Sequence, residues 1–235
     1  MGNSSDSSAS KLQIVGTPIG NLGDLSERAA EAFRSCDLVA CEDTRVTGKL
    51  LNHLQIERPM ISYRDANERE VAEQLLSQLQ SGKTITLVSD AGVPTISDPG
   101  FRITRLCQKH GIPVTPIPGP CAFITALSAS GLPTDSFLFI GFLPPKKAAR
   151  QRIFTEYSDF PHTLVFYEST HRIEKCLKDM ELVYGSERYV SVAKELTKLH
   201  ERIHTDRLGK LKDDVLRRSL KGEFVVMVAA DSFEL

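Results

Sequence analysis

Short apolar runs alternate with amphipathic segments along most of the chain. Buried strands are predicted at 12–15, 37–41, 85–89, 112–117, 137–142, 163–168, 189–193 and 223–229. Helices are predicted at 24–36, across 49–54, from Asp98 to Gly111, at 122–130, from Lys146, after Thr170 and near 208–220. Strands that alternate with helices are typical of an α/β fold.

Two α/β domains are predicted, because the proline-containing polar turn LPTDS separates two alternating blocks. We expect an N-terminal domain at 11–133 and a C-terminal domain at 134–235. The small and polar residues 1–10 predict a disordered tail, without the apolar segment of a secretory signal. Asp24 with Glu27 resembles a capping box for the first helix, and Pro99 suits the first turn of the helix from Asp98.

Composition narrows the class of protein without naming a ligand. The hydrophobic and charged fractions, 41% and 25%, are ordinary for a globular protein, and no apolar run is long enough to cross a bilayer. The formal net charge of −1 lacks the basic excess of many nucleic-acid binders, which neither proposes nor excludes RNA. Five scattered cysteines without a CxxC pair indicate a reduced, cytoplasmic protein.

Candidate chemistry gathers where the predicted strands end. The loops there read GTPIGNLGD, EDTR, SDAGVP, PGPCA, YESTHR and KELTK, and they carry the carboxylates of Glu42, Asp43, Asp90, Glu168 and Glu195. Ligands of open α/β sheets bind at the carboxyl ends of strands, so these loops predict one shared pocket. The alternative is that each loop holds only ordinary turn and helix-cap residues.

Several common sites are excluded by spacing. Gly16, Gly20 and Gly23 follow G-x3-G-x2-G, which is neither the dinucleotide fingerprint nor a P-loop. The histidines and cysteines are scattered, so no metal is predicted, and there is no G-x-S-x-G elbow. Pro18 removes one N–H donor from the first loop, which suits a snug apolar contact and a ligand that is only partly charged.

A set of motifs in order along the chain resembles the tetrapyrrole methylase superfamily. The motifs are TPIGNL, EDTR, SDAG followed by SDPG, PGPCA with ITALSASGLP, GFLP, FYESTHR, KELTK and GEFVV, and they extend from about Leu12 to Ala230. Among its branches, the chain is similar to the one that methylates ribosomal RNA. The resemblance implies two α/β domains, each a mixed sheet flanked by helices, with S-adenosylmethionine in the cleft between them, and a homodimer.

The implied reaction is 2'-O-methylation of a cytidine ribose in small-subunit ribosomal RNA, with the RNA or the assembled small subunit as partner. The implied cofactor-binding residues are Thr17, Pro18, Ser89, Asp90, Ala91, Gly92, Thr125, Ala126, Leu196 and Gly222. The ribose hydroxyl must lose a proton, and the candidates that assist are Asp43, Asp65, Glu168 and Lys194. Arg45, Asn67 and Arg172 are suited to holding RNA phosphate or sugar.

Several of these residues have a structural role as the alternative to the functional one. Asp43 is an alternative cap for the helix near Thr44, and Glu168 with Arg172 is an alternative surface pair at i,i+4. The basic cluster of Lys146, Lys147, Arg150 and Arg152 is either a solvated helix face or a contact with RNA phosphate.

The motifs depart from the superfamily pattern at a few positions. Ala66 stands where relatives usually have histidine, Val93 and Lys194 replace a threonine and an arginine, and the further C-terminal helical segment of many relatives has no counterpart here. The last difference leaves three alternatives open: weaker binding of RNA, binding with the help of a partner protein, or a different target. Two other functions therefore remain open: a methylase of a tetrapyrrole or another small molecule, and a catalytically silent protein that binds S-adenosylmethionine or RNA.

Overall fold

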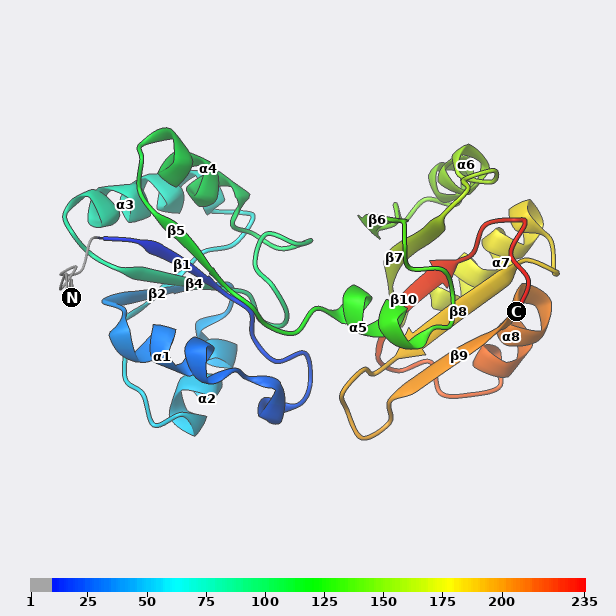
Figure 1. Cartoon of the computed structure of the whole chain (residues 1–235), viewed down its shortest axis with the longest axis horizontal. Helices are drawn as coiled ribbons and strands as arrows, with labels where there is room; N and C mark the ends of the chain where they lie inside the picture. The colour runs from blue at the N-terminus through cyan, green and yellow to red at the C-terminus, as the bar shows by residue number, and fades with distance from the viewer. Residues whose placement is uncertain (1–9) are drawn as a thin grey trace, which may run out of the picture. The chain divides into compact units, whose positions relative to one another are not determined.

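A computed structural model describes residues 10–235, and the chain divides into two compact units after Cys121 (Figure 1). Nearly all of the predicted tail therefore lies outside the described residues. The division precedes the expected boundary at residue 133 because helix α5 (Ala122–Ala129) packs on the second unit's sheet. Phe123 of α5 stacks on Phe139 at 4.1 Å between ring centroids, and Thr163 Oγ1 donates a hydrogen bond to the Pro133 carbonyl at 2.7 Å.

The first unit contains a parallel sheet in the strand order β3-β2-β4-β1-β5. Its strands are β1 (Leu12–Val15), β2 (Leu38–Cys41), β3 (Met60–Ser62), β4 (Ile85–Val88) and β5 (Val114–Ile117). Because every strand runs in the same direction, the loops that follow them meet at one edge of the sheet.

Helices cover both faces of this sheet (Figure 1). The short 3-10 helix η1 (Leu22–Asp24), α1 (Glu27–Ser35) and α2 (Thr44–His53) follow β1 and β2, whereas α3 (Glu68–Gln80) and α4 (Phe101–Lys109) follow β3 and β4. Val39 packs in the same core as Phe33 of α1, while the next residue, Ala40, packs in the core of Leu75 of α3. Burial on both faces explains why β2 is apolar at every position.

Two helices begin at residues other than those predicted. Ser26 caps α1, because its Oγ accepts a hydrogen bond from the Ala29 N–H at 3.1 Å, so the prediction of a capping box at Asp24 was wrong. Helix α4 begins at Phe101 and not at Asp98, because Gly100 has a φ of 143° that no helical residue adopts.

The second unit contains a mixed sheet in the order β6-β7-β10-β8-β9, in which only β6 and β7 are parallel. The strands are β6 (Phe137–Phe142), β7 (Thr163–Ser169), β8 (Tyr189–Lys194), β9 (Arg202–Arg207) and β10 (Glu223–Val228). Helices α6 (Lys147–Glu156), α7 (Ile173–Tyr184) and α8 (Leu208–Leu216) pack on one face, and α5 lies on the other (Figure 1).

The basic cluster before and within α6 does not form one solvated face. Lys146, Lys147 and Arg152 are exposed, but Arg150 is buried and its guanidinium is hydrogen-bonded to the Asp179 carboxylate of α7. Arg150 is therefore part of the core of the second unit, which corrects the prediction that it faces solvent or RNA. Within residues 10–235, no helix has the length and apolarity needed to span a membrane.

Candidate functional site

The loops after β1 and β4 are joined directly in the first unit. The Thr17 N–H donates to the Gly92 carbonyl at 2.8 Å, and the Gly92 N–H donates back to the Thr17 carbonyl at 3.1 Å. Thr17 is buried, and its hydroxyl donates to the Ser89 carbonyl at 3.2 Å. Three predicted cofactor-binding residues, each from a loop at the carboxyl edge of the sheet, thus lie together.

Glycine allows the loops after β1 and β5 to touch through their backbones. A Cβ on Gly16 would lie 2.8 Å from the Gly119 Cα, and a Cβ on Gly119 would lie 2.7 Å from the Gly16 Cα. Backbone cannot yield as a flexible side chain does, so any larger residue would push the two loops apart. Gly16, the first glycine of GTPIGNLGD, therefore allows the loops after β1 and β5 to approach closely.

The EDTR loop is tied to the SDAG loop through a carboxylate. The Asp43 N–H donates to Asp90 Oδ1 at 3.0 Å. Asp43 also caps α2, because its Oδ1 accepts from the Arg45 N–H at 2.8 Å, which confirms the capping role. The Arg45 guanidinium, 2.5 Å from Asp43 Oδ2, holds the pKa of that carboxyl well below its usual range. Asp43 is consequently a weak proton acceptor.

Three other carboxyl groups at this edge have raised pKa values. Burial raises the pKa of Glu42 and of Asp90, and it raises the pKa of Asp98 to about 6. The charges of Glu42, Asp90 and Asp65 add to the rise at Asp98. Carboxylates that raise one another's pKa values create a negative potential, which favours a cationic ligand. Asp98 was not among the predicted site residues, because SDPG reads as the start of a helix.

The turn after β3 contains Asp65, Ala66 and Asn67. Asn67 Oδ1 accepts from the Arg64 N–H at 2.7 Å, and its Nδ2 donates to the Ser62 carbonyl at 3.0 Å. Both polar ends of the Asn67 amide are therefore engaged in shaping the turn. Asp65 is exposed, and its charge contributes to the raised pKa values of Glu42 and Asp98, so it belongs to the same edge.

In the second unit, Glu168 and Arg172 connect two loops. The Glu168 side chain is fully buried, and its Oε1 accepts from the Ser169 N–H at 2.7 Å and pairs with Arg172 Nε at 2.9 Å. Arg172 Nη1 donates to the Leu143 carbonyl at 3.0 Å, so the pair ties YESTHR to GFLP. Burial of the carboxylate excludes the alternative of a surface pair. Glu168 Oε2 is buried and has no hydrogen-bond partner.

The loop after β8 packs on the turn before β10. Glu195 Oε1 accepts from the Glu223 N–H at 3.2 Å and from Lys198 Nζ at 3.1 Å. A Cβ on Gly222 would lie 2.6 Å from that same oxygen, so glycine makes room for the Glu195 carboxylate. Lys194 Nζ donates to the Ser219 carbonyl and lies 5.8 Å from the centroid of the Phe224 ring.

Non-glycine residues with positive φ concentrate in the loops after β4 and β8. Thr95 and Ser97 have φ values of 76° and 63°, and Glu195 and Thr197 have values of 51° and 63°. Such conformations persist only where surrounding contacts impose them, and they are enriched at ligand sites. The predicted cofactor-binding residues fall into two sets. Thr17, Pro18, Ser89, Asp90, Ala91 and Gly92 lie in the first unit, and Thr125, Ala126, Leu196 and Gly222 in the second. Among the described residues, no group of three His, Cys, Asp or Glu side chains is arranged to hold a metal ion.

Sequence comparisons relate the chain to one family of known proteins. The family model described as Tetrapyrrole (Corrin/Porphyrin) Methylases matches residues 11–212. The chain is 50% identical over 229 residues to "Ribosomal RNA small subunit methyltransferase I" of Escherichia coli O157:H7, an alignment that covers 96% of this chain and 79% of that protein.

Solved structures with low sequence identity show the same fold. A diphthine synthase matches with a TM-score of 0.75 at 16% identity and covers 96% of this chain and 92% of its own. The uroporphyrin-III C-methyl transferase from Thermus thermophilus, in complex with S-adenyl homocysteine, matches with a TM-score of 0.61 at 17% identity, covering 93% and 97% of the two chains.

Proposed function

Because this chain belongs to the tetrapyrrole methylase family, and within it to the ribosomal RNA small subunit methyltransferase I proteins, we propose that it transfers a methyl group from S-adenosylmethionine to small-subunit ribosomal RNA. The observation that carries the proposal is 50% identity across nearly the whole chain. Two solved uroporphyrin-III C-methyltransferase structures are only 19% and 17% identical to this chain, so RNA is favoured over a tetrapyrrole as substrate. We further propose the 2'-oxygen of a cytidine ribose as the acceptor.

Two features of the first unit's loops support binding of S-adenosylmethionine. The approach of Gly16 to Gly119 and the Thr17–Gly92 bridge bring loop backbones together at the carboxyl edge of the sheet. The negative potential around Asp90 suits a ligand that carries a sulfonium and an ammonium group. We propose that the six predicted residues of the first unit and the four of the second bind the cofactor.

The bound cofactor supplies a methyl group that its sulfonium already activates. The chain's own residues must then place the ribose hydroxyl in line with that methyl group and accept its proton. Asp98 is proposed as the proton acceptor, because a pKa of about 6 makes its carboxylate a stronger base than Asp43. The weaker candidates are Asp65, which is exposed, and Lys194, which is hydrogen-bonded to a carbonyl.

The remaining predicted residues divide into contacts with RNA and supports for the loops. The Arg45 side chain is 86% exposed, so we propose that it contacts phosphate while it pairs with Asp43. Arg172 and Glu168 are proposed to position the loops after β6 and β7, and Asn67 to shape the turn that carries Asp65. From the similarity of the loop motifs, we also propose a cytoplasmic homodimer.

The function is tested by transfer of labelled methyl from S-adenosylmethionine to small ribosomal subunits that lack the modification. Naked small-subunit rRNA and a porphyrin precursor are incubated in parallel, and nuclease digestion locates the label. We expect label on a ribose 2'-oxygen. We expect Asp98→Asn to reduce kcat by about 100-fold, as loss of a general base typically does. Asp159→Asn, which removes an aspartate outside the proposed site, serves as the matched control.

Three outcomes would contradict parts of this proposal. Label in the porphyrin precursor alone would move the activity to small molecules. Binding of S-adenosylmethionine without methyl transfer to any ribosomal substrate would make the chain a silent binding protein. An unchanged kcat in Asp98→Asn would remove that carboxylate from the reaction while leaving the function intact.

A further inference from the structure

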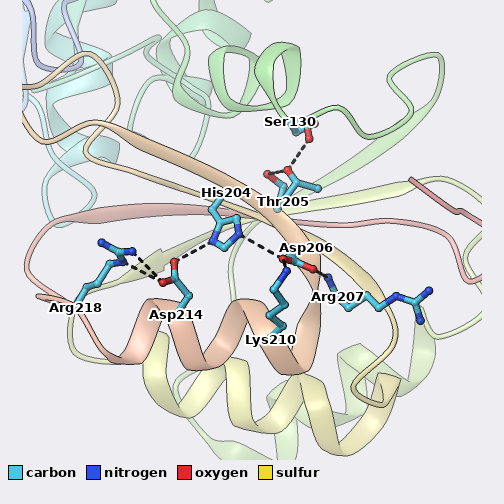
Figure 2. Close-up of polar contacts among 9 residues, drawn as sticks. Ser130, His204, Thr205, Asp206, Arg207, Lys210, Asp214 and Arg218 are labelled. Carbon is cyan, nitrogen blue, oxygen red and sulfur yellow. Dashed lines mark hydrogen bonds and ion pairs between the residues drawn. The ribbon is translucent and has the colours of Figure 1, made fainter.

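A groove of about 680 Å³ opens between β9, the last strand of the second unit's sheet, and α8, which follows it directly (Figure 2). Arg202, His204 and Asp206 line it from β9, and Lys210, Asp214 and Arg217 line it from α8 and its C-cap. Every second residue of a strand faces the same side, and residues spaced by three or four share one face of a helix. The groove is therefore built by two matching polar stripes.

Ion pairs inside the groove neutralise two of its three carboxylates, Asp206 and Asp214 (Figure 2). The third, Asp213, is exposed and lies 3.8 Å from Lys212 Nζ. His204 lies between the first two, with Nδ1 3.1 Å from Asp214 Oδ2 and Nε2 3.7 Å from Asp206 Oδ2. Lys210 Nζ lies 2.6 Å from Asp206 Oδ2, and Arg218 Nη2 lies 3.0 Å from Asp214 Oδ1. The hydrogen bonds from Lys210 and Arg218 lower the pKa values of Asp206 and Asp214, so both stay ionised and paired.

Two positive charges in the groove remain available to a ligand. Arg202 and Arg217 are exposed, and no described residue holds either guanidinium through a hydrogen bond or ion pair. The segment 202–221 contains seven Lys or Arg residues against three Asp, in a chain whose net charge is −1. Arg207 and Lys212 pair with glutamates outside the segment, and Lys210 and Arg218 pair with Asp206 and Asp214. The cations of the segment that no ion pair with a described residue neutralises are therefore Arg202, Arg217 and Lys221, and the first two line the groove.

We propose that the groove binds the sugar-phosphate backbone of the RNA substrate through Arg202 and Arg217. The proposal rests on the proposed function, because RNA is the polyanion on which this enzyme would act. Guanidinium groups bind phosphate with paired hydrogen bonds, and contacts with phosphate position an RNA without reading its sequence. The groove adds affinity for RNA, while the loops at the strand ends perform methyl transfer.

The test compares wild type with the double variant Arg202→Gln/Arg217→Gln. Its matched control is Arg105→Gln/Lys109→Gln, which removes two exposed positive charges from α4 in the first unit. Binding of fluorescently labelled naked small-subunit rRNA is measured at several salt concentrations. Methyl transfer to small subunits then gives kcat and KM, and a thermal melt verifies that each variant is folded.

We expect the groove variant to bind RNA about ten-fold more weakly at moderate salt. The slope of log affinity against log salt should fall by about 1 to 2, as for the loss of one or two phosphate contacts. KM for the subunit should rise by a similar factor, while kcat at saturating substrate and the affinity for S-adenosylmethionine stay at wild-type values. The control variant should match wild type in all of these measurements.

Other results separate this proposal from the proposed function. RNA affinity and salt slope equal to those of the control variant would overturn the groove proposal even when wild type methylates RNA. A higher KM for assembled subunits with unchanged binding of naked RNA would assign the groove to a ribosomal protein, which also overturns it. Absence of methyl transfer by wild type would overturn the proposed function, while the RNA-binding measurements would still decide on the groove.

Discussion

Arg150 and Asp179 form a buried ion pair between α6 and α7, with side chains that are 3% and 5% exposed. Asp179 also accepts a hydrogen bond from Gln151 Nε2 at 3.0 Å, so both of its oxygens are engaged. We expect Asp179→Ala to lower the free energy of unfolding by about 3–5 kcal/mol, because it leaves a buried guanidinium unpaired. Urea denaturation measures the change.

The matched comparison for this pair is an exposed one on α7. Lys178 Nζ lies 2.7 Å from Glu174 Oε1, and Lys178→Ala should cost less than about 1 kcal/mol. The double variant Arg150→Met/Asp179→Leu should recover much of the stability lost in Asp179→Ala, because it buries no unpaired charge. A double variant less stable than Asp179→Ala would contradict this account.

Asp98 gives the opposite case, a carboxyl group whose ionised form is disfavoured by folding. The pKa of Asp98 is about 6 in the folded protein, above its value in the unfolded chain. The contribution of Asp98 to stability is therefore complete only below the unfolded pKa, and it is lost as the pH rises through about 6. At pH 8, Asp98→Asn should therefore be more stable than wild type by roughly 1–2 kcal/mol, after allowance for partial exposure.

Urea denaturation of wild type and Asp98→Asn at pH 4 and pH 8 tests this linkage. The difference between them should be small at pH 4 and should grow toward pH 8. Asp159→Asn is the control for removing an aspartate charge elsewhere. A difference that is the same at both pH values would show that Asp98 titrates normally.

At the scale of elements, strands with continuous apolar runs were predicted correctly, whereas β3, α3 and β9 were not predicted. β9 reads RIHTDR, because one of its faces carries the ion pairs of the groove and not a hydrophobic core. β3 is a three-residue edge strand, too short for a pattern to be recognised. Patterns of hydrophobicity report burial in a core, so an edge strand that packs through ion pairs gives no such signal.

The same limit applies to the site. The loops were found because glycines and carboxylates follow apolar runs, and the structure joins Thr17 to Gly92 and Asp43 to Asp90 as one shared edge requires. Asp98 was missed because its raised pKa depends on burial and on carboxylates distant in sequence. The spacing of residues along the chain carries no information about burial or about the charge of carboxylates that are distant in sequence.

Helix α1 allows the choice between two caps to be tested. Ser26→Ala removes the hydrogen bond to the Ala29 N–H and should destabilise the protein by about 1 kcal/mol. Asp24→Ala should change stability by less than about 0.5 kcal/mol, because Asp24 ends η1 and does not cap α1. Thermal or urea denaturation of both variants measures the two losses of stability. A larger loss in Asp24→Ala than in Ser26→Ala would support the capping box.

At the scale of the whole molecule, each unit has its own sheet and its own hydrophobic core. The proposed cofactor residues are nevertheless divided between the units, six in the first and four in the second. A ligand that binds only the folded form stabilises whatever folded parts it contacts. Ligand-induced stabilisation can therefore report whether both units take part in binding.

We expect S-adenosylmethionine at 100 times its Kd to stabilise the protein by about 2.7 kcal/mol, which corresponds to a rise in Tm of roughly 5–10 °C. Asp90→Asn removes a carboxylate from the carboxyl edge of the first unit's sheet, and Gly222→Ala forces a Cβ against Glu195 in the second unit. If the cofactor contacts both units, each variant should reduce the ligand-induced shift measured by calorimetry, while Asp159→Asn should retain it. A full shift in Gly222→Ala, with loss of the shift in Asp90→Asn, would confine the cofactor to the first unit.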